Sequence, residues 1–169
     1  KIDTKNTEKL IFPRYHQLNL IKKFRSQIKK DGVGNNYLVQ HTTGSGKSYS
    51  IGWLSHTLTS LYQKDGDTKR MFDSIIVVTD RKVLDNQLQK TIDDLKKNKG
   101  VVYPVEKGSS DLKKFLESGK DIIISTIQKF PQISDTISSL GDKRFAVIID
   151  EVHSSPVSYT HLTLPTTGI

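Results

Sequence analysis

A helix is predicted after Pro13, because apolar residues recur there every three or four positions, as one face of a helix requires. These residues are Tyr15, Leu18, Ile21, Phe24 and Ile28. Proline suits the first turn of a helix, and the lysines at positions 29 and 30 suit its C-terminal end. Gly32 and Gly34 then interrupt the pattern, so the helix is expected to end before them.

Strands are predicted where short apolar runs do not alternate with polar residues. These runs are residues 75–78, 122–124 and 145–149, with a further short run at 37–40 before a glycine-rich loop. Helical spacing is found at residues 47–62, 83–95 and 112–116. Continuous apolar strands that alternate with helices indicate a mostly parallel sheet covered by helices on both faces. The sequence therefore predicts a doubly wound α/β fold.

Composition limits the kinds of protein that this chain can be. With 169 residues, 34% of them hydrophobic, the chain is long enough for one domain with its own core. No apolar stretch approaches the roughly 20 residues of a membrane span, no export signal is recognisable, and cysteine is absent. We therefore expect a soluble, cytoplasmic protein. The formal net charge of +8 favours a polyanionic partner such as nucleic acid, although ordinary solubility explains it equally well.

The last 14 residues, 156–169, differ abruptly in composition from the rest. They contain no Asp, Glu, Lys or Arg, whereas residues 1–155 contain all 26 basic and 18 acidic residues. The string PVSYTHLTLPTTGI resembles the translation of a sequencing-library adapter, so we expect it to be non-native; a natural threonine-rich tail is the alternative. We assign residues 1–155 to one lobe that is incomplete at its C-terminal end. The start at Lys1 also indicates a fragment.

Polar residues follow each predicted strand directly. They are residues 41–43, 79–81, 125–126 and 150–151. In an open parallel sheet the carboxyl ends of the strands meet at one edge, and ligands bind outside that edge. We therefore expect these four segments, which are far apart in sequence, to form one site.

The segment HTTGSGKS, residues 41–48, resembles a Walker A phosphate-binding loop. In such a loop backbone amides surround phosphates, glycines allow close approach, a lysine neutralises the β- and γ-phosphates, and a hydroxyl binds Mg²⁺. The expected nucleotide-binding residues are Thr43, Gly44, Ser45, Gly46, Lys47 and Ser48, with Ser48 as the metal ligand. His41 occupies the position of the first glycine in the general pattern. An ordinary Gly/Ser/Thr turn is the alternative interpretation.

Asp150 and Glu151 follow an apolar run in VIIDEVH, which resembles a Walker B and DExH box. Asp150 is expected to hold Mg²⁺, directly or through water, and Glu151 to polarise the attacking water. With Lys47 they are the candidate catalytic residues. An acidic pair after a strand is often only a solvated turn, but the upstream loop favours the catalytic interpretation. His153 is expected to couple this site to the nucleic acid rather than to bind a metal, since no second His or Cys lies at ligand spacing.

Gln17, in FPRYHQ, lies about thirty residues before Lys47 and resembles the glutamine that recognises adenine in helicase-like motors. Its amide can donate to adenine N7 and accept from the N6 amine, which favours ATP over GTP. A single glutamine on a polar helix face is usually only solvated, so this assignment depends on the neighbouring motifs.

Two further segments, VVTDRKVLDNQL and STIQK, resemble helicase motifs Ia and Ib. In that family these loops hold a nucleic-acid strand through phosphate contacts from hydroxyl, amide and basic groups. The candidate DNA-binding residues are Thr79, Arg81, Thr126 and Lys129. Capping of the following helices is the alternative role, and both roles can coexist.

Five segments together resemble the motor region of the restriction (R) subunit of type I restriction-modification enzymes: FPRYHQ, YLVQHTTGSGKSYSIGWL, FDSIIVVTDRKVLDNQLQ, IIISTIQKFP and RFAVIIDEVHSS. The resemblance covers residues 11–155 and implies the first RecA-like P-loop NTPase lobe of a superfamily 2 helicase motor, truncated after the Walker B strand. It implies ATP and Mg²⁺ as cofactors, and double-stranded DNA that is translocated toward cleavage. It also implies methylation and specificity subunits as partners, and a second RecA-like lobe and a nuclease domain in the same parent chain.

Three alternatives remain open. They are another superfamily 2 motor such as an RNA helicase or remodelling ATPase, a P-loop kinase or transport ATPase that does not bind nucleic acid, and a simple binding module. ATP hydrolysis that is stimulated by DNA in the full-length protein would distinguish a motor from the P-loop kinase or transport ATPase. Helicase motors require arginines from a second lobe, so we expect the 169-residue chain alone to bind Mg-ATP weakly and hydrolyse it negligibly.

Overall fold

The computed structural model describes residues 11–42, 44–64, 66–79, 82–95, 101–106, 108–131 and 139–150, with only the helical backbone for 82–86. Within these residues four strands form one parallel sheet in the order β2-β3-β1-β4. The strands are β1 (Ser74–Thr79), β2 (Val102–Pro104), β3 (Ile122–Thr126) and β4 (Phe145–Ile149). The helices are α1 (Tyr15–Asp31), α2 (Lys47–Thr59), α3 (Lys82–Asp94) and α4 (Ser109–Ser118), with a 3-10 turn η1 (Ile127–Lys129). The predicted α/β fold, consistent with a RecA-like ATPase lobe, is confirmed.

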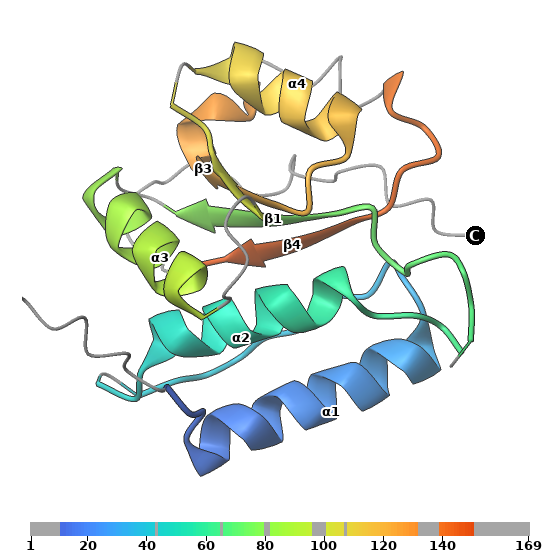
Figure 1. Ribbon diagram of the computed structural model, residues 1–169, viewed down its shortest axis with the longest axis vertical. Helices are drawn as coiled ribbons and strands as arrows, with labels where there is room; N and C mark the ends of the chain where they lie inside the picture. Colours follow the sequence, from blue (N-terminus) through green and yellow to red (C-terminus); the bar gives the residue numbers. More distant parts are fainter. Residues whose placement is uncertain are drawn as a thin grey trace, which may run out of the picture.

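Helices cover both faces of the sheet (Figure 1). α2 and α3 lie on one face, α4 lies on the other, and α1 lies outside α2. Because successive strand residues point to opposite faces, the sheet has two separate cores. Ile75 and Val77 of β1 pack with residues of α2 and α3, whereas Ile76 and Val78 pack with residues of α4. The prediction of helices on both faces is therefore confirmed.

The central strands β1 and β3 are buried along their whole length, as expected for strands covered on both faces. In their parallel register Ile75 lies opposite Ile122, and Thr79 lies opposite Thr126. The carboxyl ends of the two strands are therefore level. This alignment brings the segments that follow each strand to one edge of the sheet.

β4 departs from the prediction that every strand is buried on both faces. Its residues are only half-buried, and Ile149 is 50% exposed. Within the described residues β4 pairs with β1 on one side and with no strand on the other. An edge strand has fewer neighbours to cover it, which explains the difference from β1 and β3.

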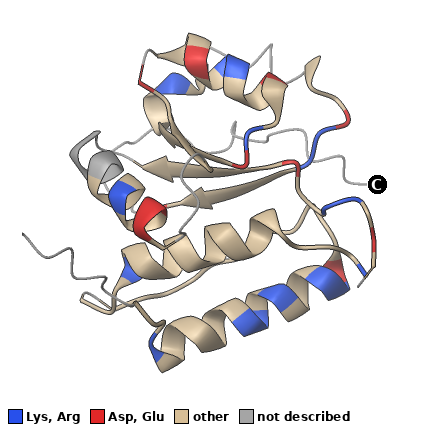
Figure 2. Cartoon of the chain, viewed as in Figure 1, with Lys and Arg blue, Asp and Glu red and all other residues tan. Residues whose placement is uncertain are grey.

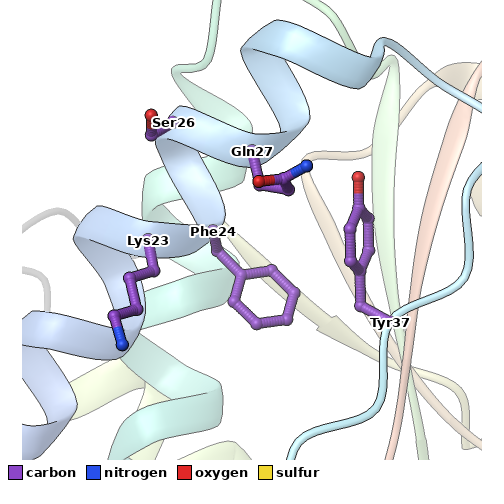
Figure 3. A pocket seen from close by; sticks show the side chains of 5 residues that line it. All are labelled: Lys23, Phe24, Ser26, Gln27 and Tyr37. Carbon is purple, nitrogen blue, oxygen red and sulfur yellow. The ribbon is translucent and has the colours of Figure 1, made fainter.

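The prediction of a strand at residues 37–40 is wrong, because the structure has no strand there. The segment is held against α1 instead (Figure 3). The ring of Tyr37 packs edge-on against that of Phe24, with centroids 5.3 Å apart, and its hydroxyl donates to Oδ2 of Asp31 at 3.1 Å. Leu38 is 98% exposed. Side-chain contacts with α1 thus determine the position of this segment, and its backbone joins no ladder among the described residues.

The apolar face predicted for α1 is buried only toward its C-terminal end. Ile28 is buried, but Tyr15 is 84% exposed and Leu18 is 40% exposed. α1 packs on α2 rather than on the sheet, so a narrower part of its surface is covered. None of the described helices is long and apolar enough to span a membrane.

The remaining elements follow the predicted pattern with changed ends. α3 and α4 lie where helical spacing occurs, whereas α2 ends at Thr59 and not at residue 62. After α2 the chain turns back, and the amide of Met71 donates to the carbonyl of Leu61 at 2.8 Å. β2 was not predicted, because its three residues are too few to show a pattern and end at Pro104, which cannot donate to a ladder.

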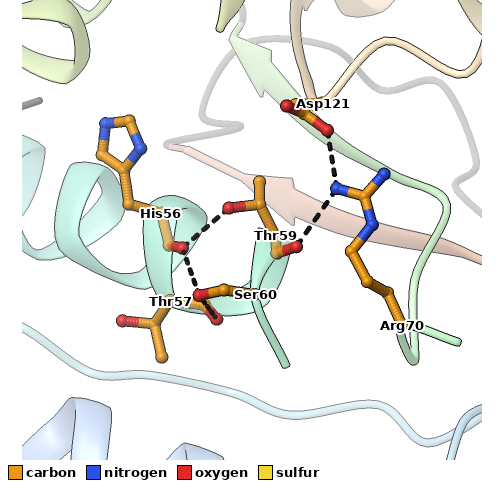
Figure 4. A network of polar contacts seen from close by, with 6 residues as sticks. All are labelled: His56, Thr57, Thr59, Ser60, Arg70 and Asp121. Carbon is orange, nitrogen blue, oxygen red and sulfur yellow. Dashed lines mark hydrogen bonds and ion pairs between the residues drawn. The ribbon is translucent and has the colours of Figure 1, made fainter. Parts of the chain in front are cut away.

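A polar network ties α2 to β3 at the amino ends of the strands (Figure 4). Nη1 of Arg70 donates to Oδ1 of Asp121 at 2.6 Å and to the carbonyl oxygen of Thr59 at 3.2 Å. In the last turn of α2 the carbonyl oxygen of His56 accepts from Oγ1 of Thr59 at 2.8 Å. Asp121 directly precedes β3, so this network lies opposite the edge where the polar segments gather. Its role is structural.

Candidate functional site

The carboxyl ends of the strands bring separate segments together, as predicted. Thr79 ends β1 beside Thr126 at the end of β3. On the other side of β1, Val78 lies opposite Ile149, and the next amide, that of Asp150, donates to the carbonyl oxygen of Val78 at 2.9 Å. This hydrogen bond extends the β1–β4 ladder by one residue. It fixes Asp150 at the edge of the sheet.

The loop before α2 contains two glycines with left-handed backbone geometry. Gly44 and Gly46 have φ values of 77° and 82°, in the left-handed region that other residues rarely adopt. Gly46 is the N-cap of α2 and offers no side-chain cap, and the first turn of α2 contains no acidic residue. The uncapped amides and the helix dipole therefore favour an anion at this end of α2.

Lys47 and Asp150 form an ion pair that joins this loop to β4. Nζ of Lys47 lies 3.3 Å from Oδ1 of Asp150, and the Asp150 side chain is only 11% exposed. Oδ1 is buried and receives no hydrogen bond from any described residue, so the contact is an attraction of charges without hydrogen-bond geometry. Ser48 follows Lys47 in the first turn of α2 and is half-buried. The structure thus brings the two separate sequence motifs into contact.

The first turn of α1 contacts the same loop through two successive side chains. Nε2 of His16 lies 2.9 Å from the carbonyl oxygen of Ser45, and Nε2 of Gln17 donates to the carbonyl oxygen of Gly46 at 3.0 Å. Oε1 of Gln17 accepts from the amide of Arg14 at 2.8 Å. Gln17 is buried, with 3% of its surface exposed. The expected site residue Gln17 therefore lies at the loop, and its adenine-binding role stays a prediction.

His16 is a site residue that the sequence did not reveal. It stands on the exposed side of α1, where no periodicity or motif distinguishes it from other polar residues. Its position beside Gln17 is the one signal that could have identified it. His41 also contacts the loop: its Nδ1 lies 3.1 Å from Oγ of Ser45, and its ring lies 6.2 Å from that of His16. Burial lowers the pKa of His41, and the positive charges of His16 and Lys47 lower it further.

The described candidates for DNA contact point into the protein. Thr79 and Thr126 are buried, and Oγ1 of Thr79 has no hydrogen-bond partner among the described residues. Nζ of Lys129 donates to the carbonyl oxygen of Val105. These contacts place the three residues at the expected edge of the sheet, with their polar atoms directed inward. Their role in binding DNA stays a prediction.

Four expected site residues lie outside the described part of the chain. They are Thr43, Arg81, Glu151 and His153. Each is next to, or within three residues of, a described residue that has been placed here, namely Gly44, Thr79 or Asp150. Their assignments stay predictions from the sequence.

The chain matches the model of one protein family, the SWI2/SNF2 ATPases, over residues 16–167. This match includes most of the segment 156–169, and the expected boundary at residue 155 remains a prediction. No solved structure matches the chain significantly.

Curated relatives are endonuclease subunits of type I restriction enzymes. A subunit from Staphylococcus saprophyticus is 26% identical over 156 residues, which are 90% of this chain and 16% of that protein. One from Staphylococcus aureus strain COL is 29% identical over 133 residues, 76% of this chain and 13% of that protein. A putative C-terminal part of such a subunit from Mycoplasma pneumoniae is 30% identical over 159 residues, 84% of this chain and 71% of that protein.

These matches agree with the site. The chain spans less than a fifth of the length of the two staphylococcal relatives. The family match covers most of the chain and includes both Lys47 and Asp150. An ATPase domain implies ATP as the nucleotide. The chain belongs to the SWI2/SNF2 ATPase family and is a distant homologue of the endonuclease subunits of type I restriction enzymes.

Proposed function

We propose that this chain is the ATP-binding lobe of a type I restriction enzyme R subunit, which couples ATP hydrolysis to the translocation of double-stranded DNA before cleavage. The observation that carries the proposal is the contact of Lys47 with Asp150, 3.3 Å apart at the edge of the sheet. In this proposal Gly44, Ser45, Gly46 and the preceding Thr43 surround the phosphates. Lys47 neutralises the β- and γ-phosphates.

The residues at this edge suit Mg²⁺. Oδ1 of Asp150 is a buried oxygen that receives no hydrogen bond from the described residues, so it can bind a cation. Within the described part of the chain no three His, Cys, Asp or Glu side chains gather into a metal site. Mg²⁺ in phosphoryl-transfer sites uses one or two protein ligands, with phosphate oxygens and water completing its shell. Ser48 and Asp150 would hold the ion, which supplies charge neutralisation at the phosphates.

The adjacent residues complete the proposed chemistry. Glu151 polarises the water that attacks the γ-phosphate, and His153 couples this step to the nucleic acid. Gln17 recognises adenine: its amide still has one N–H and one lone pair beyond its contacts with Gly46 and Arg14. Thr79, Arg81, Thr126 and Lys129 contact DNA phosphates. Of these residues, Thr79 and Thr126 end β1 and β3 at the same edge, and Lys129 ends the turn that follows β3.

The relatives' names support the proposed assembly. The names describe endonuclease subunits of type I restriction enzymes. These two relatives are much longer than this chain. We propose that methylation and specificity subunits are partners of the parent protein, and that the parent chain also contains a second RecA-like lobe and a nuclease domain. The second lobe supplies the arginines needed for turnover.

DNA-stimulated ATPase activity of the parent R subunit tests the proposal. Lys47→Ala should abolish hydrolysis because the phosphates lose their cation. Glu151→Gln should retain ATP binding and lose hydrolysis, because an amide polarises water less than a carboxylate. Lys113→Ala, on the exposed side of α4, is the matched control and should leave the rate unchanged. Normal DNA-stimulated turnover in either site variant contradicts the site assignment.

Family membership supports one alternative, a remodelling ATPase of the SWI2/SNF2 type that acts on DNA within a different assembly. Such a protein would share the nucleotide site and lack the nuclease. Cleavage of unmethylated DNA by the parent protein with its partner subunits would exclude the alternative. ATP-dependent translocation without cleavage would favour it.

A further inference from the structure

The first turn of α1 holds two successive carbonyl groups of the nucleotide loop. Nε2 of His16 lies 2.9 Å from the oxygen of Ser45, and Nε2 of Gln17 lies 3.0 Å from the oxygen of Gly46. A carbonyl oxygen can only accept, so the contact at His16 requires a hydrogen on its Nε2. Two neighbouring side chains of one helix therefore donate to two neighbouring peptide groups of the loop.

The contact at His16 bears on where the Gly46 amide points, whereas the Gly46 carbonyl is also held within α2 by the amide of Ser50 at 3.1 Å. In a planar trans peptide the C=O and N–H groups point in opposite directions, and none of the described peptide bonds is cis. The Ser45 carbonyl belongs to the same peptide group as the Gly46 amide, and the Gly46 carbonyl to the same group as the Lys47 amide. When α1 holds both carbonyls, both amides point away from α1. A hydrogen bond at the carbonyl also polarises the N–H of the same group.

Ser45 is held from a second direction by His41. Nδ1 of His41 lies 3.1 Å from Oγ of Ser45, and the rings of the two histidines are 6.2 Å apart. The backbone of Ser45 thus contacts α1, and its side chain contacts the segment before the loop. Ser45 is therefore held through both its backbone and its side chain.

We propose that His16 is a positioning residue for the phosphate-binding loop, which orients the amide of Gly46 toward the nucleotide phosphates through its contact with the Ser45 carbonyl. The inference rests on the proposed role of this loop in binding ATP. The stability of α1 does not require His16, because the cap of α1 is made by Arg14 and Gln17 and the His16 side chain is exposed. Its contact with the Ser45 carbonyl reaches across 29 residues to the loop.

Binding of a fluorescent ATP analogue to the protein with Mg²⁺ tests this inference. His16→Ala should weaken binding by about 2- to 10-fold, the range expected for one lost hydrogen bond. His16→Gln retains a donor of similar reach and should recover most of the affinity. Tyr15→Ala is the matched control, since Tyr15 is the adjacent residue of the same turn and is 84% exposed.

A second measurement separates positioning from folding. With the analogue bound, amide hydrogen exchange at Gly46 should be faster in His16→Ala than in the unaltered protein, whereas exchange in β1 and β3 should be the same in both. Equal affinity of His16→Ala and Tyr15→Ala overturns the inference, as does a His16→Gln variant no better than His16→Ala. If the unaltered protein fails to bind the analogue, the proposed nucleotide site is wrong independently of His16.

The outward face of α1 is strongly basic, which is an independent observation. α1 contains five cations and one acid, Asp31 at its end, so 17 residues carry a charge of 5 − 1 = +4 in a chain whose net charge is +8. The cations are Lys22, Lys23, Arg25, Lys29 and Lys30. At 100° per residue they fall within about 160° of the helix circumference, opposite buried Gln17 and Ile28. Figure 2 shows blue bands of Lys and Arg along α1, whereas the one Lys or Arg of α2 is Lys47.

We infer that this basic face of α1 binds the phosphate backbone of duplex DNA, which deepens the proposed function by naming a surface. Lysines with long stems suit sequence-independent phosphate contact, and no acidic residue interrupts them from Tyr15 to Lys30. This face adds long cationic side chains to the expected DNA motifs, whose described side chains are directed into the protein in this structure. Thr79 and Thr126 are buried, and Lys129 donates to the protein backbone.

Salt-dependent binding of a short duplex tests the surface. Lys22→Gln/Lys23→Gln should weaken binding and lower the slope of log affinity against log salt by up to about 2, since each lost phosphate contact removes about 0.9. Lys113→Gln/Lys114→Gln is the matched control, because it removes the same charge from two adjacent exposed lysines of α4. Equal behaviour of the two double variants overturns the inference.

Two further outcomes show whether the DNA inference or the proposed function is wrong. If Lys22→Gln/Lys23→Gln loses affinity for polyglutamate and keeps its affinity for duplex DNA, the face belongs to an acidic protein partner and the DNA inference is wrong. If the unaltered protein shows no salt-dependent DNA binding, the DNA part of the proposed function fails as well.

Discussion

The ammonium group of Lys47 lies 3.3 Å from Oδ1 of Asp150, which links the start of α2 to the end of β4. Among the described residues, Lys47 is the one cation that forms an ion pair with the buried Oδ1 of Asp150. In the proposed nucleotide complex both groups exchange this contact for others, Lys47 for phosphate oxygens and Asp150 for a cation. We therefore expect the pair to separate when Mg-ATP binds.

Asp150→Asn should remove the dependence of ATP affinity on Mg²⁺. An amide is a much poorer Mg²⁺ ligand than a carboxylate, so the variant should bind ATP equally with Mg²⁺ and with a chelator. Calorimetric titration under both conditions measures this. Asp142→Asn, in an exposed turn, should keep the Mg²⁺ dependence of the unaltered protein. A variant at position 150 that retains this dependence would show that other groups hold the ion.

Gly46→Ala should destabilise the fold more than Gly44→Ala. Both residues have positive φ, so a side chain costs about 1–2 kcal/mol of backbone strain at each. At Gly46 a Cβ would also lie 2.8 Å from Nε2 of Gln17, whereas at Gly44 it would meet nothing within 4 Å. Denaturant unfolding measures the difference. In a Gln17→Ala background the two glycine substitutions should cost the same; if they do not, the collision with Gln17 is not the cause.

Acidification should destabilise the protein through His41. Burial, His16 and Lys47 lower the pKa of His41 below its usual value of 6.5, so the unfolded chain takes up the proton more readily. The contribution of His41 to stability is therefore complete above about pH 6.5 and is lost as the pH falls toward the lower folded-state pKa. Unfolding free energies at several pH values should decline less steeply in His41→Asn. Parallel curves for the two proteins would exclude this role.

Ile124→Val should destabilise the protein more than Ile148→Val. Both residues lie opposite Val77 on the same face of the sheet, but Ile124 is fully buried in β3 and Ile148 is half-buried in edge strand β4. Removal of a buried methylene typically costs 0.5 to 1.5 kcal/mol, about the range expected for Ile124, and less where the side chain is partly exposed. Denaturant unfolding of the protein measures both. Equal losses would show that β4 is covered as completely as β3.

The contact between the glycine-rich loop segment and the acidic strand end could be predicted because each is a local pattern. Within the eight residues 41–48, two glycines allow a left-handed backbone, a lysine supplies a positive charge and a serine supplies a hydroxyl. Apolar runs without alternation indicated β1, β3 and β4, and sheet geometry alone required their polar ends to meet. The sequence therefore determined the fold class and the edge at which Lys47 and Asp150 meet.

The tertiary structure decided the features that depend on contacts between distant elements. His16 carries no local signal and became part of the site because α1 packs on α2 with its first turn at the loop. Tyr37 packs on Phe24 instead of entering the sheet, although its segment is as apolar as a short strand. Thr79 and Thr126 were expected to contact DNA, and both are buried where β1 and β3 end side by side. Periodicity within one element reveals which residues can be buried, and the packing of other elements determines which of them are.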